Sequence, residues 1–173
     1  MHRFRTTLVA MSFLAAVTAA YAQAPAKSAA KPKGQPAPPP AAHVMVNAAD
    51  LKWGPPPPAL PAGSQITVLE GDPGKAAPFV LRAKMPDGYK IMPHWHPTDE
   101  YVTVLSGTLV AGMGEKWDDA AMKTFTAGGF AKMPKKTAHY VTAKGETIIQ
   151  VHAMGPFVVT YVNPKDDPRK KTN

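Results

Sequence analysis

An all-β domain, either an antiparallel sandwich or a barrel, is predicted by three features of the sequence. Apolar and polar residues alternate in several short stretches, which is the pattern of a strand with one buried face. Turns that contain glycine separate these stretches. The 20 Pro and 13 Gly among 173 residues disfavour long helices. A chain of this length can bury one ordinary core, so we expect a single folded domain.

The expected strands follow a proline-rich segment and continue almost to the C-terminus. The clearest of them spans 79–85, where every second residue is apolar until the chain reaches the turn at Asp87-Gly88. The segment 115–122 is the one place where a helical turn is expected. The expected strands are 66–69, 79–85, 101–105, 108–111, 124–127, 139–142, 147–152 and 157–162.

The first 22 residues have the three parts of a secretory signal peptide. Arg3 and Arg5 give a positive start, the stretch 8–17 is apolar, and a small-x-small triplet ends at Ala22. The apolar stretch is shorter than the roughly 20 residues that a membrane-spanning helix needs. We therefore expect cleavage after Ala22 and a location outside the cytoplasm, in a bacterial periplasm.

Residues 23–61 are expected to form a disordered tether followed by a proline-rich arm. The first half is almost entirely Ala, Pro and Lys, a composition that cannot bury enough apolar surface to fold. The proline cluster at 55–58 predicts a polyproline II arm. Trp53, Leu51 and Leu60 would hold this arm either on the folded domain or on a neighbouring subunit.

The formal net charge of +8 lies mainly outside the part that is expected to fold. The signal segment contributes +2, positions 23–43 contribute +3, and the basic tail at 165–173 contributes +2. Positions 44–164 hold eleven basic and ten acidic residues, which leaves +1. A nearly neutral domain lacks the basic face that binds nucleic acid, so we expect no such partner.

Because the chain has no cysteine, a metal site would have to use His, Asp or Glu side chains. His94 and His96 are two residues apart, which places both on one face of a strand at a separation of about 6.5–7 Å. A bend at Pro97 would return Glu100 to the same face. Closure of a barrel could bring His139 opposite them, so that three nitrogens and one carboxylate surround a divalent cation.

The spacing of these residues resembles that of the cupin superfamily. The pattern Gly88-x5-His94-x-His96-x3-Glu100-x6-Gly107 agrees with the first cupin motif at every defined position. A lone His-x-His pair would be weak evidence, but five residues in register make the resemblance specific. It covers about positions 64–164 and implies a single cupin-type jelly-roll β-barrel, which we place at 62–164. It also implies one divalent metal ion held by His94, His96, Glu100 and His139.

The second cupin motif is only partly present. Gly128-x5-Pro134 and His139 have the expected spacing, whereas Lys136 and Ala143 replace the usual glycine and asparagine. Lys136 requires that the turn avoid a positive φ, or that it accept a modest strain. Because His139 is retained, these departures concern the turn rather than the metal ligands.

The resemblance implies a metal-dependent enzyme, and we interpret the chain as a secreted, dioxygenase-like oxidoreductase for a small oxygen-rich or aromatic substrate. The ligand set suits Mn, Fe, Ni, Co and Zn alike. Glu100 would act as a proton acceptor. His152 shares a strand face with Gln150 and could enter the same cavity as a second catalytic group.

A non-catalytic module that binds or senses a small ligand through the same metal is the competing interpretation, since cupins serve both uses. Cupins often pair through their sheet faces, so the resemblance also suggests a homodimer.

Overall fold

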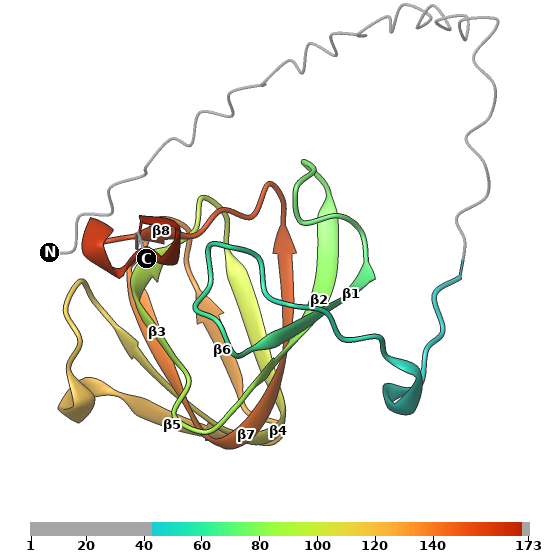
Figure 1. The fold of residues 1–173 in the computed structure, drawn as a ribbon, viewed down its shortest axis with the longest axis horizontal. Coiled ribbons are helices and arrows are strands. Elements are labelled where there is room, and N and C mark those ends of the chain that lie inside the picture. The colour runs from blue at the N-terminus through green and yellow to red at the C-terminus, as the bar shows by residue number, and fades with distance from the viewer. Residues whose placement is uncertain (1–42, 171–173) are drawn as a thin grey trace, which may run out of the picture. The chain divides into compact units, whose positions relative to one another are not determined.

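The computed structural model describes residues 43–170 (Figure 1). The predicted signal peptide, the predicted tether up to residue 42 and the last three residues of the basic tail lie outside the described residues. Within residues 43–170, none of the helices has the length and apolar character that crossing a membrane requires.

Strands are the main regular secondary structure of the described chain, which confirms the all-β prediction. The strands are β1 (Gln65–Glu70), β2 (Pro78–Met85), β3 (Lys90–Trp95), β4 (Glu100–Met113), β5 (Lys123–Thr126), β6 (Phe130–Met133), β7 (His139–Met154) and β8 (Thr160–Tyr161). The helical elements are short 3-10 turns: η1 (Ala48–Asp50), η2 (Asp119–Ala121), η3 (Pro164–Asp166) and η4 (Pro168–Lys170). The turn η2 lies inside the segment where a helical turn is expected.

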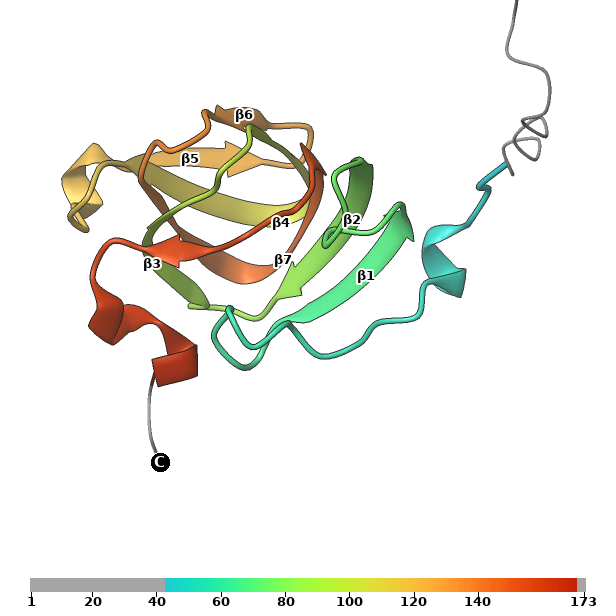
Figure 2. The same cartoon turned by 90° about the horizontal axis from the view of Figure 1, so that it is seen from above.

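Two long antiparallel strands, β4 and β7, form the centre of the sheet. Their pairing runs from Glu100 opposite Ala153 to Met113 opposite His139. β2 pairs with β7, and β1 pairs with the other edge of β2. β3 pairs with a different part of β7, and β8 pairs with β3. β5 and β6 both pair with β4. Figure 2 shows that the sheet curls, with β1 and β2 on one side and β5 and β6 on the other.

β4 and β7 each contain two of the predicted strands, joined through a glycine. The pairing between them shifts register on both sides of Ser106. Gly107 follows with a φ of 75°, and a Cβ atom there would collide with the carbonyl oxygen of Glu146. Only glycine fits both this backbone angle and this close approach, so it bends the strand without ending it.

Three further elements differ from the prediction. The expected strand at 157–162 is reduced to the two residues of β8, because the N–H of Phe157 donates to the carbonyl oxygen of Pro73 at 2.7 Å and not to a neighbouring strand. β3 and β6 are strands that the expected set did not include, and the pairing of β3 with β7 shifts register between Ile91 and His94. Strands as short as β6 contain too few residues for alternation to be recognised.

Alternate residues of the strands point to the inner face of the curved sheet and form the core. On β4, for example, Val102 and Val104 are buried while Tyr101 is exposed. Burying each large apolar side chain contributes roughly 1.5–3 kcal/mol. The core residues are Phe79, Ala83, Met85, Tyr89, Val102, Val104, Leu109, Ala111, Met133, Val141, Ala143, Ile149, Val151 and Ala153.

The proline-rich arm packs on its own domain. Gly54 exchanges two backbone hydrogen bonds of 2.9 Å with Ile66 in β1. The ammonium group of Lys84 lies 4.9 Å from the centre of the Trp53 ring. Of the two positions expected for the arm, the structure therefore shows the one on the folded domain.

Lys136 adopts the positive φ that its side chain disfavours. Its φ is 57°, which lies in the left-handed region and costs a non-glycine residue roughly 1–2 kcal/mol. The backbone N–H of Lys136 donates to the carbonyl oxygen of His96 at 2.8 Å. This contact ties the turn before β7 to the segment after β3, so a tertiary hydrogen bond accompanies the strained conformation.

Replacing Lys136 with Gly is expected to raise the free energy of unfolding by about 0.5–1 kcal/mol, because glycine adopts a positive φ without strain. Chemical denaturation of the metal-free chain measures this change. Lys136→Ala removes the same exposed charge but keeps a Cβ atom, so it should show no gain. An equal gain in both variants would assign the effect to the charge.

Candidate metal centre

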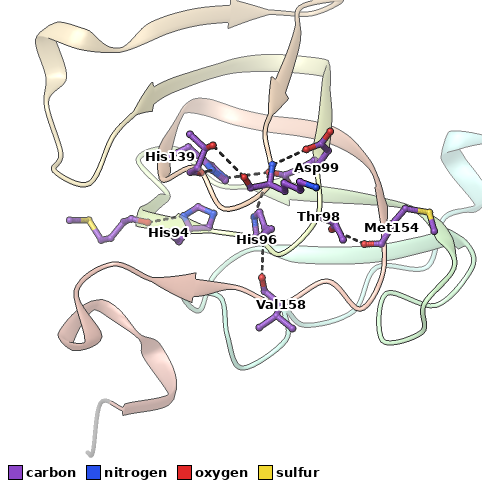
Figure 3. Close-up of polar contacts among 11 residues, drawn as sticks. His94, His96, Thr98, Asp99, His139, Met154 and Val158 are labelled. Carbon is purple, nitrogen blue, oxygen red and sulfur yellow. Dashed lines mark hydrogen bonds and ion pairs between the residues drawn. The ribbon is translucent and has the colours of Figure 1, made fainter.

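Three histidines and one glutamate come together inside the curved sheet. His94 lies in β3, His96 follows the end of β3, Glu100 is the first residue of β4, and His139 is the first residue of β7. All four side chains are buried, with exposed fractions of 8% or less. One nitrogen from each histidine lies within 4.8 Å of the others. The sequence predicted this group, and Figure 3 shows the three imidazoles converging.

The fold brings together residues from opposite ends of one ladder. Glu100 is paired with Ala153, whereas His139 is paired with Met113 at the far end. In a flat sheet these two ends would be separated by the full length of β4. Glu100 Oε2 nevertheless lies 3.3 Å from His139 Nε2, because the two long strands bend and the sheet folds back on itself.

Thr98 and Asp99 fasten the loop between His96 and Glu100 to other segments of the chain. The Thr98 hydroxyl donates to the carbonyl oxygen of Met154 at 2.8 Å (Figure 3). Asp99 turns away from the cluster, accepts a hydrogen bond from the N–H of Lys135 at 2.8 Å and pairs with the ammonium group of Lys132 at 2.8 Å.

Each imidazole is oriented by a backbone carbonyl at its Nδ1 atom. His94 contacts the oxygen of Met92 at 2.8 Å, and His96 contacts the oxygen of Val158 at 2.9 Å. His139 contacts the oxygen of Thr137 at 3.1 Å. Because a carbonyl can only accept, these contacts assign the proton of each ring to Nδ1. The lone pair of a neutral ring is then on Nε2, the atom that binds metal when Nδ1 has such a partner.

Burial controls the protonation of the cluster. Burial, together with the nearby His139 and His96, lowers the pKa of His94 to about 3. Burial also lowers the pKa of His96, although the Glu100 carboxylate opposes this shift. Burial disfavours ionisation of Glu100, but the protons that His139 and His96 carry when they are charged outweigh that effect and lower its pKa. Neutral imidazoles and an ionised carboxylate are the forms that bind metal ions.

These residues fit a divalent metal ion. Among residues 43–170, His139 Nε2 is buried without a hydrogen-bond partner, and His96 Nε2 lies 3.5 Å from Glu100 Oε2. With the ring protons on Nδ1, lone pairs face one another in these contacts and no proton lies between them. Such an arrangement is unfavourable unless a cation occupies the space. Three imidazole nitrogens and a carboxylate oxygen are ligands for Mn, Fe, Co, Ni and Zn.

A cavity of about 520 Å³ adjoins the cluster. His94, His96 and Glu100 form part of its wall, and most of the other lining side chains are aliphatic. A cavity of this size accommodates a small organic molecule. A more open hollow runs along the proline-rich arm, but none of the four clustered residues lines it.

A family model described as "Domain of unknown function (DUF4437)" matches residues 6–160. The chain belongs to this family. No curated protein matches the sequence.

Solved structures show that this DUF4437 chain has the cupin fold, as predicted. The polyketide cyclase RemF from Streptomyces resistomycificus gives a TM-score of 0.57 at 19% identity, over 73% of this chain and 89% of RemF. An acetylacetone dioxygenase-like protein from Methylibium petroleiphilum PM1 gives 0.57 at 18% identity, over 74% and 86% of the two chains. An RmlC-like cupin from Shewanella frigidimarina gives 0.51 at 13% identity, over 66% and 94%.

The structure contradicts the placement of His152 in the cupin cavity. His152 is exposed on the outer face of β7, and its Nε2 lies 3.2 Å from the Gln150 amide nitrogen. Its neighbours Val151 and Ala153 are the residues that point inward. Alternation correctly groups His152 with Gln150, but it does not indicate which face of the strand is buried.

Sequence reasoning missed the segment that supports His96. The Phe157 ring stacks on the His96 ring, with 4.1 Å between centroids and 18° between planes. The carbonyl oxygen of the next residue, Val158, accepts from His96 Nδ1. These residues are more than 60 positions from His96 and lie in a predicted strand, so no local pattern marked them as part of the site.

Replacing His96 with Ala is expected to lower metal affinity by more than about 100-fold, because even residues that only support a ligand contribute 10–100-fold. Elemental analysis of the dialysed chain gives the metal content per chain, and circular dichroism checks the fold. His152→Ala is the matched control and should retain the metal. One metal ion per chain in His96→Ala would contradict the site.

The metal-free chain should become less stable as the pH falls below about 6.5. In this range the unfolded chain protonates His94, whereas the folded chain cannot until the pH approaches about 3. Protonation therefore favours unfolding, and stability decreases as the pH falls through this window. His94→Gln should reduce this pH dependence. Thermal unfolding in the presence of chelator, between about pH 7.5 and about pH 5, compares the two chains, and parallel curves would contradict the assignment.

Proposed function

We propose that this chain is a secreted, metal-dependent cupin enzyme with dioxygenase-like activity on a small oxygen-rich or aromatic substrate. One observation carries the proposal: the buried imidazoles of His94 and His96 and the Glu100 carboxylate line a mainly aliphatic cavity, and the third imidazole, His139, contacts Glu100 beside them. A cluster that only stabilised the fold would have no need to face such a cavity. Titratable groups that border a cavity are candidates for a functional site.

His94, His96, His139 and Glu100 would hold the metal ion. When bound, an ion with this ligand set has open positions that can polarise a substrate oxygen or, with iron or manganese, activate dioxygen. The backbone carbonyls at Nδ1 keep the three rings in the orientation that binding needs.

Glu100 has a second role in the proposal, as a proton acceptor. The carboxyl group is ionised near neutral pH, so it can take a proton from a bound hydroxyl or enol, although its lowered pKa makes it a weaker base than an ordinary glutamate. The aliphatic cavity wall excludes water around the reacting group, which strengthens the electrostatic interactions there.

The relatives of known fold fit such chemistry without establishing it for this chain. One is described as a polyketide cyclase and another as acetylacetone dioxygenase-like. Polyketides and acetylacetone both carry several oxygen atoms on a carbon skeleton, which is the substrate type proposed here.

Export to the periplasm is part of the proposal and rests on the sequence of residues 1–22. N-terminal sequencing of the protein from the native source tests it, and the sequence should begin at Gln23.

The chain loaded with Fe(II) or Mn(II) should consume dioxygen with at least one flavonol, catechol or 1,3-diketone. Glu100→Gln should lower the rate by about 100-fold or more, because positioned acid and base groups contribute 10²–10⁴-fold. His152→Ala should leave the rate unchanged. Oxygen-electrode assays, repeated with Ni(II) and Zn(II), measure these rates. Tight ligand binding without turnover for every metal would contradict the enzyme and support the binding module.

A further inference from the structure

The proline-rich arm forms part of the cavity that contains the metal cluster. Pro55, Pro57, Ala59 and Leu60 line this cavity together with side chains of β1 and β2. The segment before β1 crosses in front of the curved sheet in Figure 1. The arm therefore provides one wall of the site, although it precedes the first strand of the domain.

The arm is fastened at several points along its length. The Tyr89 hydroxyl donates to the carbonyl oxygen of Pro61 at 2.7 Å, and the Tyr161 hydroxyl donates to that of Ala59 at 2.9 Å. Near its start, Gly54 is paired with β1. Both tyrosines are buried, with exposed fractions of 7% and 6%. The arm is thus a fixed wall.

The composition of the arm suits an apolar cavity. Prolines at 55–58 have no backbone N–H, so this part of the arm presents no unsatisfied donor to the cavity. The N–H of Leu60 is already bonded to the carbonyl oxygen of Pro57 at 2.9 Å.

The rest of the cavity wall has few polar groups. Among the residues that the structure describes, no lysine or arginine lines it. Outside the metal cluster its polar side chains are Ser64 and Tyr89, and the Ser64 hydroxyl donates to the Tyr89 hydroxyl at 3.0 Å. A carboxylate or phosphate group placed away from the metal would find no cation to pair with. Burial of an unpaired charge is strongly unfavourable.

We propose that the proline-rich arm, residues 54–61, restricts the site to ligands that have an uncharged, apolar body and that direct their oxygen atoms to the His94, His96 and Glu100 wall. This inference rests on the proposed metal site and narrows the proposed substrate class. It favours aryl ketones, enols and phenols over dicarboxylates and sugar acids.

A matched pair of ligands tests the proposal. 1-Phenyl-1,3-butanedione and its derivative with a carboxylate at the para position of the ring present the same two diketone oxygens to the metal. The first has an uncharged body, whereas the derivative carries a negative charge on the body, away from the metal. Isothermal titration calorimetry with the Zn(II)-loaded chain measures binding without redox turnover. The diketone should bind at least about tenfold more tightly. Equal or tighter binding of the para-carboxylate derivative would overturn the proposal.

Two arm variants test the role of the wall. Leu60→Ala enlarges the cavity and should weaken diketone binding about five- to tenfold. Pro58→Ala is the control, because Pro58 is an exposed arm residue that does not line this cavity. Metal content and thermal unfolding confirm that both variants are folded and loaded. If the two variants bind the diketone equally well, the arm does not shape the site.

The ligand pair also separates this inference from the proposed enzymatic activity. If the chain prefers the diketone but consumes no dioxygen, the substrate class stands and the dioxygenase proposal fails. If dioxygen is consumed but the para-carboxylate derivative binds as tightly as the diketone, the activity stands and the role of the arm fails.

Discussion

The facing lone pairs of three imidazoles and one carboxylate are the constraint on which the site depends. Each ring places its Nδ1 atom against a backbone carbonyl, so each Nε2 atom is left pointing into a shared buried space. Glu100 adds its negative charge to that space. Because no proton lies between these buried groups, their lone pairs repel one another. A cation bound in the shared space would remove this repulsion. A bound cation would then lie at the wall of the neighbouring cavity, where His94, His96 and Glu100 are.

The fold produces this convergence by bending its longest strands. β4 and β7 each continue through a glycine, and the close approach at Gly107 leaves no room for a side chain. Without the bends, Glu100 and His139 would remain at opposite ends of the same ladder. The glycine at the end of the first cupin motif therefore contributes to the site through backbone geometry.

Support for the site also comes from segments with little regular structure. Phe157 and Val158 hold the His96 ring, and the proline-rich arm covers one side of the cavity. Neither segment contributes a candidate ligand. Both segments pack on the curved sheet and are held by hydrogen bonds to residues that are distant in sequence. The cavity is therefore formed by segments near both ends of the described chain.

The sequence by itself determined the all-β class, the cupin resemblance and the four residues that meet at the centre. The alternation of apolar and polar residues along a strand and the spacing from His94 to Glu100 are local properties of the sequence, so they can be recognised without the structure. Only the tertiary structure decided that β4 and β7 are continuous, that His152 faces outward, that Lys136 takes a positive φ and that the arm packs on its own domain. Each of these outcomes depends on contacts between segments far apart in the chain, and no local pattern records which of those contacts form.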